Sequence, residues 1–368
     1  MRYAHITGWG MAVPDRVLTN HDLAQMVDTS DEWIRTRTGI RERHVAGPED
    51  TTASLAVRAA LQALETAQVR PNEVDLIIVA TSSPEYNNFP ATASLVQDAI
   101  GATRAGAFDL AAACSGFIFA VNMAAQTIRS GALDTVLVIG TETLSRIVDW
   151  QDRNTCVLFG DGAGAFVLQA SSEPGGVLSG VMRSDGSGAE TLYIPAGGSR
   201  LPASAETVAQ RLHFVRMNGR EVFRFATRVM ADATREAVAA AGWSLEELDL
   251  VIPHQANVRI IEAAAKRLKM PMERFVVTLD RYGNTSTASI PITACEAARA
   301  GRLRPGDKVV MVGFGGGLTW GAIAVQWSGP LTTLKARRTV RRPYLWWNRL
   351  RSTLRRLGRR LLGWLSWP

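Results

Sequence analysis

The chain has 368 residues, of which 46% are hydrophobic and 20% are charged, and its formal net charge is +7. This composition predicts a globular protein with a large core, long enough for two domains or two fused halves. Three cysteines in such a length argue against a disulfide framework, and the first twenty residues contain no apolar secretory segment. We therefore expect a reducing, cytoplasmic location.

The positive charge lies at the C-terminal end. Residues 331–368 contain eleven of the 41 Lys and Arg residues and no acid, so residues 1–330 hold 30 bases against 34 acids, a net charge of −4. The net positive charge of the chain thus comes from an appended tail. The body contains no motif that would predict nucleic-acid binding.

Along the body, strand-like and helix-like segments alternate at a spacing that predicts parallel or mixed sheets covered by helices. The nearly continuous apolar strand at residues 76–80 predicts burial on both faces. Residues 110–128 contain no charge, but Cys, Ser, Gly, Asn, Gln and Thr interrupt them. They predict a buried central helix over residues 115–129 rather than a membrane span.

The body also resembles an internal duplication. A helical pattern followed by a strand at residues 53–82 resembles residues 225–254, with Asp75 matching Asp249. Two further matches follow in the same order, residues 131–140 with 301–313 and residues 164–168 with 321–325. Three matches in one order predict two related halves.

Three short segments place a thiol, an imidazole and a carboxamide among small residues: Ala-Ala-Ala-Cys114-Ser-Gly, Pro-His254-Gln-Ala-Asn and Tyr-Gly-Asn284-Thr-Ser. Cys114 stands where a helix begins, so the positive end of the helix dipole is expected to lower its pKa. This set is suited to thioester chemistry. The thiol belongs to the predicted first half, residues 1–172, and the other two groups belong to the second, residues 173–330.

Together with Asp-Glu-Trp33-Ile-Arg-Thr-Arg37, Phe159-Gly-Asp-Gly-Ala-Gly and Phe314-Gly-Gly-Gly-Leu-Thr-Trp, these motifs resemble the β-ketoacyl-acyl-carrier-protein synthase III family of type II fatty-acid synthesis. The resemblance extends to about residue 328. It implies the thiolase fold, a duplicated five-layered αβαβα sandwich with the active site between the halves, in a homodimer. It also implies a reaction of acyl-CoA, a substrate rather than a cofactor, with malonyl-acyl-carrier protein.

The resemblance further implies the roles of the residues. Cys114 would accept the acyl group, the backbone N–H groups of Cys114 and Gly316 would bind the oxyanion, and His254 and Asn284 would stabilise the enolate left by decarboxylation. Other matching positions are expected to contact CoA (Trp33, Arg37, Arg153, Asn257), to line the acyl pocket (Phe89, Phe159, Met217) or to bind the acidic carrier protein (Arg224, Arg259, Lys266, Arg267).

Two departures from the family pattern concern the substrate. Asn154 stands where glycine is expected beside the nucleotide, and the segment before Phe89 is longer by about two residues, which leaves the acyl chain length open. Since no CxxC pair, HExxH, Walker loop or GxGxxG occurs, we expect no metal and no redox cofactor.

The resemblance ends before the basic linker and tail of residues 331–368. There a single apolar stripe recurs every three or four residues, opposite a face of arginines: Trp346, Trp347, Leu350, Leu354, Leu357, Leu361 and Trp364. Such a pattern predicts an amphipathic helix on an anionic membrane surface. Packing against the body and binding to an acidic partner are the alternatives.

Two other functions compete with the condensing reaction. A related synthase or acyltransferase of a specialised pathway would use the same cysteine and histidine for another acceptor. A scaffold without catalytic activity would use the fold only to bring its tail to membranes. A complete set of Cys114, His254 and Asn284 favours carbon–carbon bond formation, because the asparagine serves mainly in decarboxylation.

Overall fold

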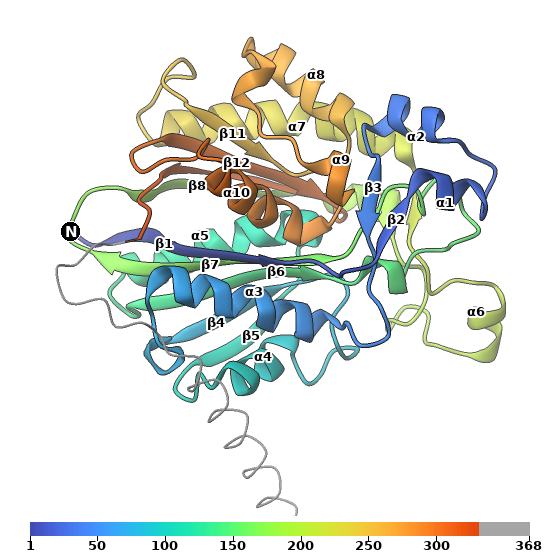
Figure 1. Ribbon diagram of the computed structural model, residues 1–368, viewed down its shortest axis with the longest axis horizontal. Coiled ribbons are helices and arrows are strands. Elements are labelled where there is room, and N and C mark those ends of the chain that lie inside the picture. The colour runs from blue at the N-terminus through green and yellow to red at the C-terminus, as the bar shows by residue number, and fades with distance from the viewer. Residues whose placement is uncertain (331–368) are drawn as a thin grey trace, which may run out of the picture.

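The computed structural model describes residues 1–330. The predicted amphipathic helix and its apolar stripe lie outside the described residues. Figure 1 shows two β-sheets stacked face to face, with helices between them and on both outer faces.

The first sheet has five strands, in the order β1 (Tyr3–Ala12), β7 (Gly162–Ser171), β6 (Thr135–Glu142), β4 (Leu76–Ala80) and β5 (Gly106–Leu110). The strands β1, β7 and β6 pair antiparallel, whereas β6, β4 and β5 pair in parallel. Both β6 and nearly all of β4 are buried. The predicted burial of the strand at residues 76–80 is confirmed.

The second sheet repeats this arrangement, in the order β8 (Gly176–Ser184), β13 (Thr319–Gln326), β12 (Lys308–Gly315) and β11 (Leu250–Pro253). Again the first two pairs are antiparallel and the last pair is parallel. A single bridge between Val251 and Phe275 takes the place of the fifth strand. In each half one aspartate accepts a hydrogen bond from the first residue of the neighbouring parallel strand in the sheet. Asp75, just before β4, accepts from Thr135 N–H of β6 (2.9 Å), and Asp249, just before β11, accepts from Lys308 N–H of β12 (2.8 Å).

Six longer helices complete the layers. On the outer face of the first sheet lie α3 (Thr52–Ala67) and α4 (Thr92–Ile100), and on that of the second lie α7 (Gly219–Ala240) and α8 (Val258–Leu268). Between the sheets lie α5 (Gly116–Arg129) and α10 (Ser289–Arg299), which pack on both. The five-layered αβαβα sandwich of the thiolase fold and the buried helix over residues 115–129 are confirmed.

Short elements connect these layers. They are the helices α1 (Asn20–Ala24), α2 (Asp31–Thr38), α6 (Ala205–Ala209) and α9 (Leu279–Tyr282), the strands β2 (Val17–Thr19), β3 (Glu42–His44), β9 (Leu192–Tyr193) and β10 (Arg216–Met217), and the 3₁₀ turns η1 (Pro71–Glu73), η2 (Ala113–Ser115), η3 (Leu144–Arg146), η4 (Gly186–Thr191), η5 (Met272–Arg274) and η6 (Ser286–Ala288). Of these, η2 and η6 precede the two central helices.

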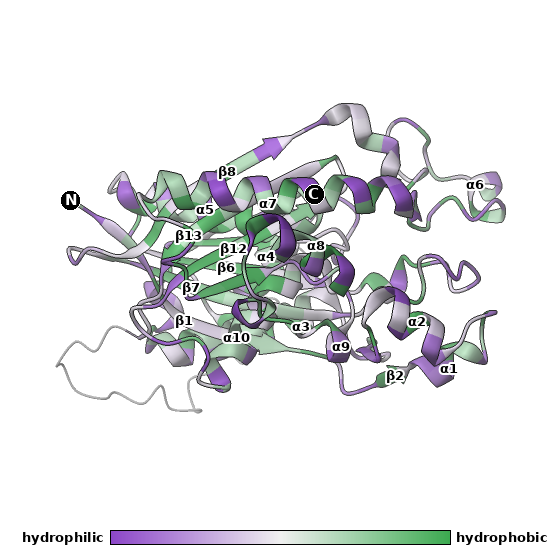
Figure 2. Cartoon of the chain, turned by 90° about the horizontal axis from the view of Figure 1, so that it is seen from above, coloured by the Kyte–Doolittle hydropathy of each residue, from purple (hydrophilic) through white to green (hydrophobic). Residues whose placement is uncertain are grey.

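Apolar residues gather on the strands and the inward faces of the helices, while the outer helices carry polar residues toward solvent (Figure 2). The central layer is held by edge-on aromatic contacts, with ring centroids of Phe117 and Phe166 at 5.0 Å and of Phe166 and Trp327 at 5.9 Å. Among the helices of residues 1–330, none has both the length and the apolar character to cross a bilayer.

Candidate active site

Cys114 lies in η2, between the end of β5 and the start of α5, and is 7% exposed. The preceding Ala113 has a φ of +45°, a left-handed conformation. It costs a residue with a Cβ about 1–3 kcal/mol and is kept only where the surroundings enforce it. The surroundings do so, because the Ser115 hydroxyl lies within hydrogen-bond distance of both Ala112 O (2.8 Å) and Thr319 Oγ1 (2.7 Å). The thiol is therefore fixed at the boundary between the halves.

The glycine run after β12 lies directly against this turn. A Cβ built on Gly315 would approach Cys114 N to 2.6 Å and Ala113 Cβ to 3.0 Å, and one built on Gly316 would approach Leu192 O to 2.7 Å. A side chain at either position would collide with backbone atoms. The run must be glycine because backbone meets backbone there.

His254 follows β11 and is 1% exposed. Its Nδ1 lies 2.6 Å from Ser289 Oγ, and Gln255 N–H donates to that oxygen at 3.4 Å. Since Ser289 Oγ already accepts from a backbone N–H, its own proton is best donated to Nδ1, which leaves the His254 proton on Nε2. Burial lowers the pKa of His254 to about 3, so the imidazole is neutral at physiological pH.

Asn284 is oriented by its backbone. Gly283, with φ +63° and ψ −156°, occupies a region essentially restricted to glycine. Asn284 N–H donates to Leu158 O (2.8 Å), and its Oδ1 accepts from Ser286 N–H (2.9 Å). Because Oδ1 is engaged in that way, Nδ2 is the atom of the carboxamide that can donate to a substrate.

The three groups line one cavity of about 140 Å³ between the halves. Its walls are mainly apolar and include two residues expected in the acyl pocket, Phe159 and Met217. The third, Phe89, is 83% exposed and does not line this cavity. The arrangement sets a thiol and two hydrogen-bond donors around a small apolar space.

A wider cleft opens from this cavity and shares Leu158, Met217 and Asn257 with it. Trp33 and Arg37 line the cleft, and the Arg153 guanidinium lies 5.0 Å from the centroid of the Trp33 indole. The lining of the cleft contains four arginines and two acids: Arg37, Arg216, Arg220 and Arg259, with Asp152 and Glu190. An anionic ligand with an aromatic ring fits this lining.

The residues expected to bind a carrier protein lie on α7 and α8. Arg224, Arg259, Lys266 and Arg267 are all exposed on these outer helices. The Arg259 guanidinium also lies 5.7 Å from the Phe223 ring and lines the cleft. The four bases thus lie on one outer layer, and Arg259 is the one that reaches the cleft.

The expected low pKa of Cys114 is wrong. Burial of the thiol raises its pKa to about 12; a hydrogen bond from the Ser286 hydroxyl lowers the pKa and the charge of Glu142 raises it. Desolvation is the largest cause, because the thiol is enclosed between the halves rather than open to water. The thiol therefore needs a base or another source of stabilisation to ionise.

Four polar residues around the site were not predicted from the sequence: Glu142, Ser286, Thr287 and Ser289. Three of them belong to the run of small hydroxyl residues that follows Asn284. Glu142 is the single acid in the otherwise apolar strand β6. An acid in a fully buried strand is the signal that could have marked it.

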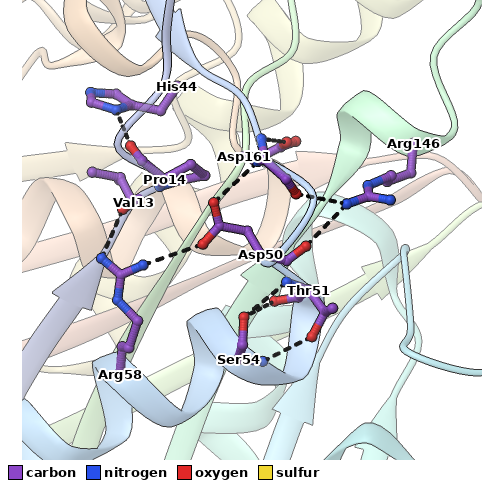
Figure 3. Close-up of polar contacts among 11 residues, drawn as sticks. Val13, Pro14, His44, Asp50, Thr51, Ser54, Arg58, Arg146 and Asp161 are labelled. Carbon is purple, nitrogen blue, oxygen red and sulfur yellow. Dashed lines mark hydrogen bonds and ion pairs between the residues drawn. The ribbon is translucent and has the colours of Figure 1, made fainter.

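A second polar network includes Asp161, which directly follows Phe159 and Gly160 in the chain, and Figure 3 shows its contacts. Asp161 accepts hydrogen bonds from Ala46 N–H (2.7 Å) and Ser145 N–H (2.9 Å), and the Asp50 carboxylate pairs with Arg58 (3.4 Å). Asp161 N–H donates to His44 O, and Gly160 N–H donates to Asn284 O. These bonds hold the loop on which Asn284 rests.

Comparison with known proteins finds two family models that match this chain. The model described as 3-oxoacyl-[acyl-carrier-protein (ACP)] synthase III matches residues 108–186, and the one for its C-terminal part matches residues 238–327. The beta-ketoacyl-[acyl-carrier-protein] synthase III of Symbiobacterium thermophilum is 61% identical over 327 residues, which are 89% of this chain and 99% of that protein.

Solved structures agree. The 3-oxoacyl-[acyl-carrier-protein] synthase III of Aquifex aeolicus VF5 is 48% identical, with a TM-score of 0.82 over 88% of this chain and 100% of that one. The priming beta-ketosynthase from the R1128 polyketide biosynthetic pathway is 36% identical, with a TM-score of 0.83 over 89% and 97%.

The state of His254 can be tested directly. With the pKa lowered from 6.5 to about 3, ¹⁵N NMR should show a neutral ring that carries its proton on Nε2 from about pH 5 to about pH 9. The spectrum of His254→Gln would assign the signal. Ser289→Ala, which removes the hydroxyl partner of Nδ1, should weaken the tautomer preference. A ring that titrates near pH 6.5 would contradict the assignment.

Proposed function

The chain belongs to the 3-oxoacyl-[acyl-carrier-protein] synthase III family, acyltransferases that condense acyl-CoA with malonyl-acyl-carrier protein at the start of fatty-acid synthesis, and we propose that Cys114, His254 and Asn284 divide this reaction between them. One observation supports the division above all. The three side chains, brought from both halves of the chain, line a single buried cavity.

In the first half-reaction, the Cys114 thiolate attacks the acyl-CoA carbonyl and CoA leaves as its thiolate. The negative charge on the carbonyl oxygen is stabilised by the backbone N–H groups of Cys114 and Gly316. Close contact between Gly315 and the Cys114 backbone supports this role, because it brings the two peptide segments together at the thiol.

In the second half-reaction, malonyl-acyl-carrier protein loses carbon dioxide and the resulting enolate attacks the acyl group on Cys114. His254 Nε2 and Asn284 Nδ2 donate hydrogen bonds to the enolate oxygen. Both donors are oriented before substrate arrives, His254 by Ser289 and Asn284 by Ser286 N–H. Fixed donors in a desolvated cavity stabilise developing charge more strongly than mobile ones in water.

The outer cleft is the proposed CoA site. Trp33 and Arg153 would sandwich the adenine, and Arg37 and Asn257 would contact the rest of CoA. Because the Arg153 guanidinium already lies 5.0 Å from the Trp33 centroid, it must swing away from the indole to admit a ring. Its ion pair with the exposed Asp28, at 3.0 Å, contributes little and opposes that movement weakly.

The cavity favours a short acyl starter such as acetyl. Phe159 and Met217 restrict its depth. We propose that Phe89, which is exposed on its own chain, closes the pocket of a second copy in a homodimer. An aromatic side chain left 83% exposed is a costly surface residue and a suitable interface anchor.

The division of labour predicts that Asn284→Ala separates the half-reactions. The variant should still transfer a radiolabelled acyl group to Cys114, but malonyl decarboxylation should fall about 10²- to 10³-fold because one enolate donor is lost. Peptide mapping of the label and release of carbon dioxide measure the two steps.

Cys114→Ala is the matched control and should lose the label altogether. Label on Cys156 or Cys295 would refute the nucleophile. Equal loss of both steps in Asn284→Ala, at an unchanged melting temperature, would refute the proposed role of the carboxamide.

Carrier recognition is proposed for the basic surface of Arg224, Arg259, Lys266 and Arg267, since acyl carrier proteins are acidic and opposite charge steers association. Lys266→Glu should raise KM for the acyl-carrier substrate roughly threefold to tenfold and weaken its salt dependence, with acyl-CoA kinetics unchanged. Lys266 is the better test than Arg259, because Arg259 also lines the CoA cleft.

Arg104→Glu provides a matched charge reversal, because Arg104 is exposed in the loop that follows α4, on the opposite outer layer. It should leave both KM values near those of the unaltered protein. If Lys266→Glu and Arg104→Glu have equal effects, the change reflects overall charge and the docking surface is wrong.

We also propose a boundary between the halves at residues 172 and 173, after β7 ends at Ser171 and before β8 begins at Gly176, and a cytoplasmic enzyme whose tail reaches the inner membrane surface. The support for the tail is its sequence: a Trp and Leu stripe, arginines on the other face, and no acid. Each large apolar side chain could contribute about 1.5–3 kcal/mol if fully buried, and each arginine about 1 kcal/mol near anionic lipid.

Truncation tests the tail. The full chain should co-sediment with anionic vesicles and only weakly with zwitterionic ones, whereas a chain that ends at Gly329 should bind neither and keep its condensing activity. Equal sedimentation of the two chains would place binding in the body. Loss of activity on truncation would favour a tail that packs on the body, and retention by acidic carrier protein instead of lipid would favour an acidic partner.

A further inference from the structure

Glu142 is a buried acid beside the nucleophile that the steps above do not use. It ends β6 with no exposed surface. The carboxyl accepts hydrogen bonds from the Ser83 hydroxyl (2.6 Å), the Thr287 hydroxyl (2.9 Å) and Ser82 N–H (3.1 Å). Its partners are thus hydroxyls and backbone N–H groups, which hold a carboxylate in place without neutralising it.

The hydroxyl of Ser286 connects this acid to the thiol. Its side chain lowers the pKa of both the Cys114 thiol and the Glu142 carboxyl, so it lies near both groups. The turn η6 that carries Ser286 packs on the turn η2 that carries Cys114, and the adjacent Thr287 hydroxyl donates to Glu142 at 2.9 Å. Ser286 has a φ of +48°, and its N–H is held by Asn284 Oδ1 at 2.9 Å. A non-glycine residue keeps such a conformation only where its surroundings impose it, so the backbone of Ser286 is fixed in place.

We propose that Glu142 is the proton acceptor for Cys114, acting through the Ser286 hydroxyl. This inference rests on the proposed function, in which Cys114 is the acylated nucleophile. Glu142 does not touch the substrate, and Ser286 transmits its effect. The carboxylate thereby supplies the base that a buried thiol needs in order to react.

The proton is accounted for at every step. The thiol proton passes to Ser286 Oγ as the Ser286 proton passes to Glu142, which leaves a thiolate and a neutral carboxylic acid. The thiolate takes the acyl group and expels CoA thiolate, which is protonated by water at the cleft. When the enolate carbon attacks the acyl group, the Cys114 thiolate leaves and recovers its proton from Glu142 by the same path.

This transfer avoids a large desolvation cost, because the cavity carries one negative charge before and after it. The charge moves from the carboxylate to the sulfur at the start of α5, where the helix dipole favours an anion. Burial raises the pKa of both groups, so the carboxylate is a stronger base than one in water. Cys114 is the titratable neighbour of Glu142, and Thr81, Ser82, Ser83, Ser286 and Thr287 are neutral.

Glu142→Gln distinguishes this role from a purely electrostatic one by the sign of its effect. If Glu142 were only a nearby negative charge, its removal would lower the Cys114 pKa and speed acylation. If it is the base, single-turnover acylation at pH 7 should slow about 10²- to 10⁴-fold. The rate should also rise about tenfold per pH unit without levelling off, because the thiol then loses its proton to water, whereas the rate of the unaltered protein should level off once Glu142 is ionised.

Ser286→Ala should reproduce this pH dependence, and it tests the path even if Glu142→Gln does not fold. Ser83→Ala is the matched control, because it removes one hydrogen bond to the same carboxyl without cutting the path to Cys114. It should retain a rate that levels off at high pH, as in the unaltered protein. Faster or unchanged acylation in Glu142→Gln would overturn the proposal.

Malonyl decarboxylation separates failure of this proposal from failure of the proposed function. It depends on His254 and Asn284 and should stay near its normal rate in Glu142→Gln. Unchanged acylation together with unchanged decarboxylation would overturn the relay alone. Absence of acyl transfer to Cys114 in the unaltered protein would overturn the proposed function itself.

Discussion

The site depends on two contacts between the halves that leave no room for a side chain. A Cβ on Gly140 in the first half would lie 2.2 Å from Thr287 O in the second, and a Cβ on Gly315 in the second would lie 2.6 Å from Cys114 N in the first. Each half therefore presents a glycine to the turn of the other. This reciprocal contact lets the two central helices begin at one point and encloses their first residues.

Enclosure determines the protonation states. The same desolvation keeps His254 neutral, raises the pKa of Cys114 and raises the pKa of Glu142. A neutral imidazole that carries its proton on Nε2 can donate a hydrogen bond to an enolate. The cost is a thiol that does not ionise on its own. A carboxylate near such a thiol is thus useful as a proton acceptor, although its charge disfavours a second anion.

The sequence allowed the two related halves to be predicted, because Asp75 and Asp249 occupy equivalent places before equivalent strands, whereas the five-layered sandwich was implied by the family resemblance. It did not reveal that the second half lacks a full fifth strand, since one bridge at Phe275 leaves no strand pattern to read. The motifs around Cys114, His254 and Asn284 identified the groups in the cavity. The pKa of Cys114 was mispredicted because a helix start can be read from sequence, whereas the depth of its burial depends on packing by the other half.

The duplication also explains why Glu142 lies where it does. Since Asp75 and Asp249 pair with Thr135 and Lys308, the strands β6 and β12 align residue by residue, and Glu142 then corresponds to Gly315. The turns that these positions contact correspond as well, since η2 and η6 each begin with a left-handed residue, Ala113 (φ +45°) and Ser286 (φ +48°), and each precede a central helix.

One end of this repeated contact carries glycine, which lets the backbone of β12 lie directly against the Cys114 backbone. The equivalent end carries a carboxylate against the Ser286 hydroxyl. In the proposed mechanism, a repeated pair of turns serves as a nucleophile on one side and as a proton path on the other. The two sides differ at three equivalent positions: Gly315 and Glu142 at the strand end, then Ala113 and Ser286, and Cys114 and Thr287, in the turn. Both versions of the contact support the same strand order, β1-β7-β6-β4 in the first half and β8-β13-β12-β11 in the second.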